Sequence, residues 1–455
     1  MSFQFFNFND SSYHPMHDAC GLFGVYSVKK RNDTVSCTVT GLGLLQHRGL
    51  DSCGISFVED DNIVTRKDLG LVKEVFRTIP DVNTHSCIGH VRYPTSRASK
   101  GSERGECQPI CSHNMALGSF AVAHNGNIPF VEGHDTNYLV NFINVAKSET
   151  WEQALINLLE TIPGVYCLLV LTKNAIYAVR DRFGVRPLCI GLRENEFCAA
   201  SESCALHKFN HYCDVGPGQI YSLNKNGVRL IYTAPSTTRN ICSFEYLYFL
   251  RPNSIVDNLS VRVLRRYLGA LLGLKDKEKF AKSRYIVMGV PDSGICAGQG
   301  YAECLNLPYQ QLIKRNLNAK RTFIQPTLEQ RKIASEGKFY YQKSELKGKN
   351  VIVVDDTIVR GTVMSVIVRQ LKECEVNEVH IRIPAPPVKD ICMFGIDIPS
   401  KEQLIKTGRS MEDLRDYFGV ASILYLEAAD LDYILPKTAC KGCFTSEYND
   451  ELLKW

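Results

Sequence analysis

The segment that most constrains this 455-residue chain covers residues 351–363 and reads Val-Ile-Val-Val-Asp-Asp-Thr-Ile-Val-Arg-Gly-Thr-Val. Four β-branched residues in succession are typical of a strand covered on both faces. In an open parallel sheet, ligands bind beyond the carboxyl ends of such strands, where Asp355 and Asp356 stand here. These carboxylates can hold ribose hydroxyls and Mg²⁺. The next six residues can cradle a phosphate with backbone N–H groups and hydroxyls: Thr357, Ile358, Val359, Arg360, Gly361 and Thr362. The alternative, a core strand followed by a polar turn, does not account for the order of these residue types.

Composition restricts the class of protein further. Apolar residues make up 45% and charged residues 22%, which are ordinary values for a globular protein of two to four domains. The net charge of +5 is too small to indicate nucleic acid as the main partner and suits small anionic substrates. The sequence contains no apolar run of about 18 residues, the length that would predict a membrane span. Residues 1–19 lack the basic start and apolar core of a secretory signal, so we expect a cytoplasmic protein without a membrane partner.

Two patterns of secondary structure divide the chain near residues 230–250. From residue 20 to about 230, short apolar runs alternate with Gly, Asn, Asp and Pro, which predicts extensive antiparallel sheet. Helical periodicity within 40–46 and 137–159 predicts helices flanking layered sheets, an α+β arrangement. From residue 246, strands and helices alternate, which predicts an α/β domain with a parallel sheet. The polar segment 328–349 is a candidate lid over a phosphate site.

Cys20 begins the first predicted strand, within Asp-Ala-Cys-Gly-Leu-Phe-Gly-Val. If residues 1–19 were removed, this thiol would carry the free α-amine of the chain, which could act as its base, as in enzymes with an N-terminal threonine nucleophile. An α-amine has a pKa near 8, close to the working pH. Without other signals, a buried strand cysteine would be the better interpretation.

Later segments favour the nucleophile. Arg92 ends a predicted strand and can clamp an α-carboxylate with two hydrogen bonds. Asn125 and Gly126 end another strand and offer an amide side chain and a backbone N–H suited to an oxyanion. Asp135 can bind an α-ammonium group. Together these residues predict a pocket for an amino acid whose side-chain carbonyl is attacked by the sulfur of Cys20.

From Cys20 to Phe444, the sequence resembles the glutamine phosphoribosylpyrophosphate amidotransferases. Several of the matching blocks are weak alone, but their order is specific. They are Cys20-Gly-Leu-Phe-Gly, Leu45-Gln-His-Arg-Gly, His90-Val-Arg-Tyr-Pro-Thr, Ala123-His-Asn-Gly-Asn, Arg180-Asp-Arg-Phe-Gly-Val-Arg-Pro-Leu, Ala200-Ser-Glu-Ser, Phe244-Glu-Tyr, Pro291-Asp-Ser-Gly, Arg321-Thr-Phe-Ile-Gln-Pro and the Asp355 loop.

The resemblance implies a leader or propeptide over 1–19, a glutaminase domain of layered αββα type over 20–240 and a phosphoribosyltransferase domain over 241–455. It also implies Cys20 as nucleophile, Arg92 and Asp135 as glutamine ligands, and Asn125 with Gly126 as oxyanion hole. Ammonia released there would displace pyrophosphate from phosphoribosylpyrophosphate (PRPP) to give phosphoribosylamine, the first committed step of purine synthesis. A homotetramer inhibited by purine nucleotides is the family's pattern.

The resemblance assigns further residues to the second site. Lys314 and Lys338 resemble family lysines that neutralise the leaving pyrophosphate, although either could be a solvated surface charge. Mg²⁺ would lie at Ser293, Asp355 and Asp356. Ser293 belongs to Pro291-Asp-Ser-Gly, which follows one predicted strand and opens a helix where backbone N–H groups can meet a pyrophosphate.

Four of the 18 cysteines have a separate interpretation. Cys440 and Cys443 form a Cys-x-x-Cys pair in a polar segment, a spacing that alone supports zinc, redox chemistry or an iron–sulfur cluster. In the family members that carry a [4Fe–4S] cluster, its ligands come from positions filled here by Cys242, Cys392, Cys440 and Cys443. The resemblance therefore implies a structural [4Fe–4S] cluster, with structural zinc and four unrelated thiols as alternatives.

Two features of the sequence depart from the family pattern, and two alternative functions need to be weighed. The connection from Asn125 to Asp135 is shorter than in the family, and Asn137 stands where a glutamate is usual, which makes Asp135 less secure than Arg92. Glucosamine 6-phosphate and asparagine synthetases share the glutaminase half, but the Asp355 loop does not fit their second halves. A PRPP-binding regulator or inactive paralogue would keep that loop while losing the nucleophile, and this chain retains Cys20.

Overall fold

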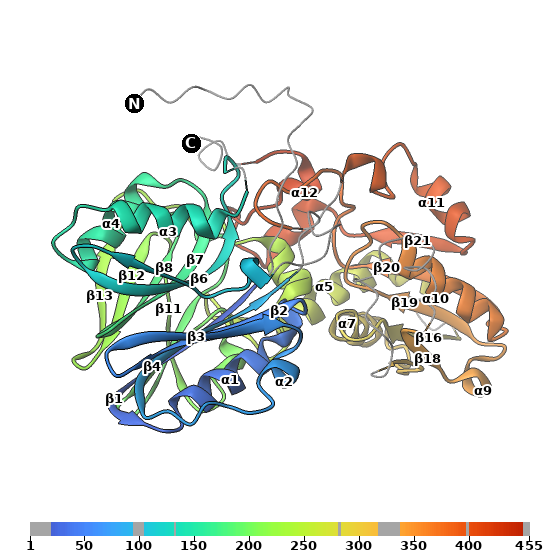
Figure 1. Cartoon of the computed structure of the whole chain (residues 1–455). Coiled ribbons are helices and arrows are strands. Elements are labelled where there is room, and N and C mark those ends of the chain that lie inside the picture. Colours follow the sequence, from blue (N-terminus) through green and yellow to red (C-terminus); the bar gives the residue numbers. More distant parts are fainter. Residues whose placement is uncertain are drawn as a thin grey trace.

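The structure is a computed structural model that describes residues 20–93, 104–131, 133–280, 284–316, 337–396 and 400–448. Two halves of the chain lie side by side, and helix α5 (Val261–Lys275) lies at their junction (Figure 1). The first half holds two antiparallel sheets, and the second holds a parallel sheet with helices around it. The predicted change of architecture along the chain is therefore confirmed.

Two sheets form the centre of the first half. In spatial order, the seven-stranded sheet consists of β11 (Asn210–Asp214), β9 (Cys189–Arg193), β10 (Glu196–Ala200), β1 (Gly21–Arg31), β4 (Thr84–Arg92), β2 (Ser52–Glu59) and β3 (Asn62–Leu69). The six-stranded sheet consists of β13 (Gly227–Thr233), β12 (Gln219–Asn224), β8 (Ala175–Arg180), β7 (Val165–Thr172), β6 (Gly118–Asn127) and β5 (Ile110–Asn114).

Three hydrophobic layers hold these sheets together. Alternate residues of β1, β4, β6 and β7 meet between the two sheets, among them Leu22, Ile88 and Leu169. Helix α1 (Thr34–Leu44) packs on the outer face of the first sheet, while α3 (Asp135–Val145) and α4 (Trp151–Thr161) pack on the outer face of the second. The result is the layered αββα arrangement that the resemblance implied.

The second half is built around the parallel order β16 (Tyr285–Gly289), β19 (Asn350–Val354), β20 (Glu378–Ile383) and β21 (Ser422–Tyr425). Its helices are α5, α6 (Lys277–Phe280), α7 (Ile295–Leu305), α9 (Lys343–Leu346), α10 (Thr362–Glu373), α11 (Met411–Phe418) and α12 (Gly442–Thr445). Two small antiparallel pairs complete it, β14 (Ile255–Val256) with β15 (Leu259–Ser260) and β17 (Ile313–Arg315) with β18 (Phe339–Tyr341). Strands β16, β19 and β20 are largely buried, as expected where helices cover both faces, while the edge strand β21 is only partly buried.

Two local predictions need correction, and a third is only partly covered by the described residues. The periodic segment 137–159 is two helices, α3 and α4, and the Thr150 side chain caps the second by accepting from Gln153 N at 3.2 Å. The helix expected over 40–46 is α1, which begins at Thr34. The prediction missed its buried first turns because they contain threonine and valine, which are weak helix formers. Of the candidate lid, 328–336 lies outside the described residues, and the remainder forms β18 and α9.

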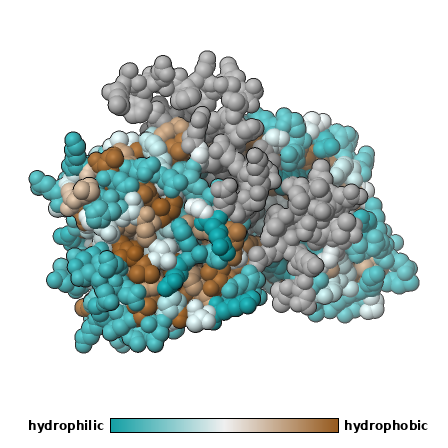
Figure 2. Space-filling view, viewed as in Figure 1, coloured by the Kyte–Doolittle hydropathy of each residue, from teal (hydrophilic) through white to brown (hydrophobic). Residues whose placement is uncertain are grey.

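Among the described residues, no helix has the length and apolar character needed to cross a bilayer. Mostly hydrophilic residues cover the visible face, above all over the second half (Figure 2). Strands β2 and β3 form one edge of the first sheet, and the short helix α2 (Val72–Val75) follows β3 there (Figure 1).

Candidate functional site

Strand pairing brings Cys20 next to Arg92. In the antiparallel pair of β1 and β4, Gly21 lies opposite Val91, so that Cys20 and Arg92 stand at neighbouring strand ends. Cys20 is fully buried, and its carbonyl oxygen accepts from Arg48 Nε at 2.9 Å. Arg92 Nη1 donates to Asp51 Oδ2 at 3.0 Å, and Nη2 donates to the Glu106 carboxylate. Carboxylates therefore already contact the guanidinium that was predicted to bind an α-carboxylate.

Asn125 and Gly126 lie at the end of β6, in the other sheet. The Asn125 side chain is fully buried, and neither its oxygen nor its nitrogen has a hydrogen-bond partner among the described residues. A buried amide without partners costs free energy unless a ligand satisfies it. At Gly126, an added Cβ would lie 1.9 Å from Val165 O, so the close approach of β6 and β7 requires glycine.

Buried histidines join the two sheets beside these residues. His90 Nε2 donates to the His124 carbonyl oxygen at 3.0 Å, and His124 Nδ1 lies 3.6 Å from Asp135 Oδ1. Burial opposes ionisation of Asp135, but His124 lowers its pKa below the usual value, so it stays a carboxylate. Asp135 Oδ2 is buried without a hydrogen-bond partner among the residues described.

His134 lies within electrostatic range of both Asp135 and Arg92. Burial lowers the pKa of His134, while Asp135 opposes this effect and Arg92 adds to it. The five residues predicted for glutamine chemistry therefore gather at one end of the two sheets: just before β1, at the ends of β4 and β6, and at the start of α3. The shortened connection from Asn125 still brings Asp135 to this end.

The buried His90 ring gives a testable pH dependence. Burial, assisted by Arg92, lowers the pKa of His90 from 6.5 to about 3, so the folded protein holds it neutral. The unfolded chain gains a proton as pH falls through about 6.5, and stability therefore falls with pH. Between pH 7.5 and 5.5, we expect wild type to lose about 1.4 kcal/mol of unfolding free energy relative to His90→Gln. Denaturant unfolding of both proteins at the two pH values measures this difference, and parallel pH dependence in the two would contradict it.

The second group of predicted residues lies beyond the carboxyl end of β19. Asp356 accepts from Thr357 Oγ1 at 2.6 Å and from Ser293 Oγ, which joins the Pro291–Ser293 turn to the Asp355 loop. Asp355 is buried, and burial together with the adjacent Asp356 raises its pKa well above the usual value. A hard cation with oxygen ligands would relieve this repulsion, which makes the donor set suitable for Mg²⁺.

The rest of the loop presents its backbone rather than its apolar side chains. Ile358 is buried in the core and Val359 packs against it, so only their main-chain groups can reach a ligand, while Arg360 is exposed. Gly361 adopts a left-handed φ of 78° and caps α10, where a Cβ would lie 2.1 Å from Ile405 Cδ1. Glycine is therefore required there, and the amino end of α10 from Thr362 points its N–H groups at the loop.

The two predicted lysines stand on the β17–β18 pair. Lys314 is exposed and pairs through its backbone with Tyr340. Lys338 is half-buried, and burial lowers its pKa while Asp355 and Asp356 oppose the change, which puts its ammonium group near the acidic pair. Arg315 Nη1, next to Lys314, donates to Asp292 Oδ2 at 2.9 Å. Of the two lysines, Lys338 has the clearer electrostatic link to the loop.

The structure brings the four singled-out cysteines to one region, named here the thiol corner: Cys242, Cys392, Cys440 and Cys443. Cys242 and Cys440 form a backbone bridge. Burial raises the pKa of Cys443 well above its usual value, and the other three thiols raise it further. Within the described ranges, no group of three or more His, Cys, Asp or Glu side chains is arranged so that it could hold a metal ion as it stands.

Sequence reasoning gave no role to a network of buried charges between Cys20 and the thiol corner. It is named here the junction network and consists of Arg48, Glu202, Glu245 and Arg186, all four fully buried. Each lies within a block that resembles the family. Their charge alone does not reveal that residues so distant in sequence meet in the fold. Their burial and reciprocal ion pairs were visible only in the fold.

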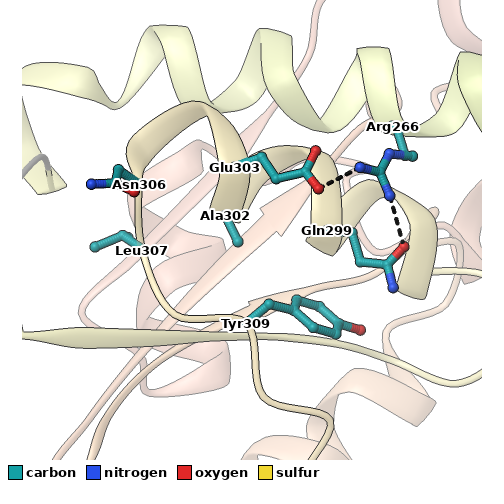
Figure 3. A pocket seen from close by; sticks show the side chains of 7 residues that line it. All are labelled: Arg266, Gln299, Ala302, Glu303, Asn306, Leu307 and Tyr309. Carbon is teal, nitrogen blue, oxygen red and sulfur yellow. Dashed lines mark hydrogen bonds and ion pairs between the residues drawn. The ribbon is translucent and has the colours of Figure 1, made fainter.

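A separate surface hollow of about 370 Å³ lies between α5 and α7 (Figure 3). Arg266 crosses it from α5 and binds Glu303 and Gln299 on α7, with Tyr309 below. These polar groups already satisfy one another, and none belongs to the predicted sites. The hollow therefore adds no residue to them.

Comparison with known proteins places the chain among named relatives. A family model described as a glutamine amidotransferase domain matches residues 96–208. An amidophosphoribosyltransferase of Bacillus subtilis is 32% identical, covering 96% of this chain and 95% of the relative. The same enzyme of Methanothermobacter thermautotrophicus is 33% identical, with 95% of each chain covered. A chloroplastic form from Arabidopsis thaliana is 34% identical over 97% of this chain and 80% of its own.

Two solved structures share the whole architecture. One, an allosteric regulatory enzyme of purine biosynthesis, superposes with a TM-score of 0.84 at 32% identity, covering 94% of this chain and 96% of its own. The other, the glutamine PRPP amidotransferase of B. subtilis in complex with ADP and GMP, has a TM-score of 0.83 at 32% identity, covering 94% of this chain and 97% of its own. The similarity therefore extends over both halves and the junction between them.

Proposed function

The chain belongs to the amidophosphoribosyltransferase family, and from that premise we propose that it transfers the amide nitrogen of glutamine to PRPP. The products are phosphoribosylamine, glutamate and pyrophosphate, and the reaction commits PRPP to purine biosynthesis. The observation that carries the proposal is the presence, on one chain, of Cys20 beside Arg92 at one end of the glutaminase sheets and of the Asp355 loop beyond β19.

In the first half-reaction, Arg92 binds the α-carboxylate of glutamine and Asp135 binds its α-ammonium group. The incoming carboxylate exchanges with Asp51 or Glu106 on the guanidinium. Cys20 Sγ attacks the amide carbon, and the Asn125 amide and Gly126 N–H donate to the developing oxyanion. The C–N bond breaks, the thiol proton ends on the leaving nitrogen as ammonia, and water then hydrolyses the thioester to glutamate.

This chemistry calls for a free α-amine at Cys20, and we propose that residues 1–19 are removed before the enzyme becomes active. The amine would then take the thiol proton and pass it to the leaving nitrogen. The buried, unpartnered amide of Asn125 supports the oxyanion role, because a tetrahedral oxyanion would satisfy its nitrogen.

In the second half-reaction, ammonia attacks ribose C1 and the bond from C1 to the pyrophosphate oxygen breaks. The 5-phosphate is bound by the N–H groups of Thr357–Thr362 and by the Thr357 and Thr362 hydroxyls. Asp355 and Asp356 hold the ribose hydroxyls. Lys338 and Lys314 neutralise the departing pyrophosphate, and the position of Lys338 near the acidic pair supports its part.

The proposal includes two inorganic groups whose ligands are this chain's own residues. Mg²⁺ would be held by Ser293, Asp355 and Asp356, and it would neutralise charge on the pyrophosphate. The thiol corner would hold a [4Fe–4S] cluster that ties the start of the second half to its end. Three buried thiols and the partly buried Cys440, from three segments, support this donor set, and Arg186 is near enough to lower the pKa of Cys242 and Cys392 against burial.

Chemical analysis distinguishes the cluster from zinc. Anaerobically purified protein should contain about four iron and four acid-labile sulfide per chain, and these should be lost together from a Cys440→Ser variant. Cys296→Ser is a matched control, because Cys296 is buried but belongs to another helix. Zinc without sulfide, or iron unaffected by Cys440→Ser, would contradict the assignment.

Further features follow the family pattern. The B. subtilis relative was solved with ADP and GMP, and this supports inhibition of the present enzyme by purine nucleotides. We also propose a homotetramer in the cytoplasm with no nucleic-acid partner.

The function is tested with the mature protein, glutamine, PRPP and Mg²⁺. We expect pyrophosphate and glutamate to form in a 1:1 ratio, because one ammonia displaces one pyrophosphate. Intact mass reports whether the chain begins at Cys20. Protein that begins at Cys20 and binds PRPP but releases no pyrophosphate would indicate a regulatory paralogue instead.

A further inference from the structure

The junction network connects the nucleophile with the second half of the chain by direct contacts. Arg48 donates through Nε to the Cys20 carbonyl oxygen at 2.9 Å. Its two terminal nitrogens donate to the two carboxylate oxygens of Glu245 at 2.7 and 3.0 Å. Glu245 begins the π-helical turn Glu245–Phe249 that precedes α5 at the junction of the halves (Figure 1). One buried guanidinium thus bridges the nucleophile's backbone and the first turn of the second half.

Arg186 extends the network to the thiol corner. Its Nη1 donates to Glu245 Oε1 at 3.1 Å, and its Nη2 donates to the carbonyl oxygens of Phe394 and Gly395 at 3.1 and 2.7 Å. This turn directly follows Cys392, whose sulfur accepts from Phe394 N at 3.3 Å. The path from Cys20 to the thiol corner therefore runs through Arg48, Glu245 and Arg186 with no solvent-exposed member.

Glu202 completes the network on the other side of Arg48. Its carboxylate accepts from Arg48 Nη1 at 2.8 Å, from Ser254 Oγ at 2.7 Å and from Arg251 N at 2.8 Å. Burial would raise the pKa values of both glutamates, but His47 and Arg48 lower that of Glu202, and Arg48 with Arg186 lower that of Glu245. Two buried cations thus face two buried anions, an arrangement that is stable only if every member keeps its partners.

We propose that Arg48, Glu245 and Arg186 are positioning residues for the glutaminase reaction, which hold Cys20 in attacking geometry only when the Phe394–Gly395 turn of the second half is in place. This rests on the proposed function and adds a dependence of Cys20 on a part of the chain that never contacts glutamine. None of the three touches a reacting atom. Their effect is on geometry, where a displacement of about 1 Å can cost about 10²-fold in rate.

The decisive variant is Arg186→Lys, because Arg186 contacts the Phe394–Gly395 turn directly and lysine keeps the charge while losing the two-pronged geometry. Arg180→Lys is the matched control. Arg180 lies six positions earlier (186 − 180 = 6) and is equally buried, and its guanidinium donates to the carbonyls of Val215 and Gly184, both in the first half of the chain. Both variants remove one buried guanidinium from the same segment.

For Arg186→Lys, we expect glutamine-dependent kcat to fall about 10- to 100-fold with the KM for glutamine little changed and ammonia-dependent synthesis retained. Labelling of Cys20 by a diazoketone analogue of glutamine, followed by mass spectrometry, should slow by the same factor. Arg180→Lys should leave both rates near wild type at a similar or lower Tm. Glu245→Gln should reproduce the Arg186→Lys pattern.

An Arg186→Lys protein whose Cys20 labelling and glutamine kcat match wild type would overturn the proposal. A parallel loss of both activities in Arg186→Lys and Arg180→Lys would also overturn it, since it would reveal destabilisation alone. If Arg186→Lys does not accumulate folded, Arg48→Lys is judged by the same criteria. Labelling of wild-type Cys20 can be measured even without phosphoribosylamine formation, so failure of the proposed function is distinguishable from failure of this inference.

Discussion

Replacing Cys20 with alanine should lower glutamine-dependent formation of phosphoribosylamine by at least about 10³-fold while ammonia-dependent formation stays near wild type. The sulfur is the only atom in the proposed first half-reaction that bonds covalently to glutamine, so no neighbouring group replaces it. The second site lies beyond β19 in the other half and does not use the thiol. Pyrophosphate release with glutamine or with ammonium salt, measured on one preparation, checks both statements.

The control is Cys167→Ala, which removes another fully buried thiol from β7 next to Asn125 in the pairing of β6 with β7. This variant should be less stable than wild type but retain glutamine-dependent turnover. Glutamine-dependent activity surviving in Cys20→Ala would remove Cys20 from the mechanism. Loss of ammonia-dependent activity in the same variant would show that the two half-reactions cannot be separated in this way.

Asp356→Asn should have the complementary effect. It removes a charge from the proposed Mg²⁺ and ribose site and weakens the contacts to Ser293 and Thr357, so ammonia-dependent synthesis should fall about 10²-fold or more. Hydrolysis of glutamine without PRPP should remain at its wild-type basal rate, because the glutaminase residues lie in the other half. Glutamate and pyrophosphate are measured separately to compare the two rates.

Asp390→Asn serves as the comparison for Asp356→Asn, because Asp390 forms an ion pair with Lys401 outside the loop. It should leave ammonia-dependent synthesis unchanged. If Asp356→Asn kept full synthesis at limiting Mg²⁺ and PRPP, the acidic pair would not be the site of sugar binding.

The sequence indicated both candidate sites because each is marked by unusual residues directly at the terminus of a predicted strand. The β19 run followed by Asp355 and Asp356 is local information, and so is Cys20 at the start of β1. The break between α3 and α4 was missed because apolar periodicity continues across it, whereas the cap at Thr150 depends on one side chain.

The residues that sequence could not assign depend on contacts between distant segments. Arg48 and Glu245 are 197 positions apart and meet only because the short Gln46–Arg48 turn after α1 and the π-helical turn converge at the junction. A lone arginine or glutamate in a sequence is most often on the surface. Likewise, the carboxylates that bind the Arg92 guanidinium belong to Asp51 and Glu106. Asp51 is brought there by the register of β2 with β4, and Glu106 by the turn before β5.

The bridge between Cys242 and Cys440 has a consequence for the order in which the protein matures. Ser243 and Cys440 are 197 positions apart, and both the Ser243 N–H and its hydroxyl donate to the Cys440 carbonyl, at 3.1 and 2.7 Å. During synthesis the glutaminase sheets are complete long before residue 440 leaves the ribosome. These contacts to the segment that carries Glu245 form only after Cys440 has been synthesised. An incomplete chain would thus have its glutaminase strands but not the support proposed for its nucleophile, so it would release ammonia only slowly before an acceptor site exists.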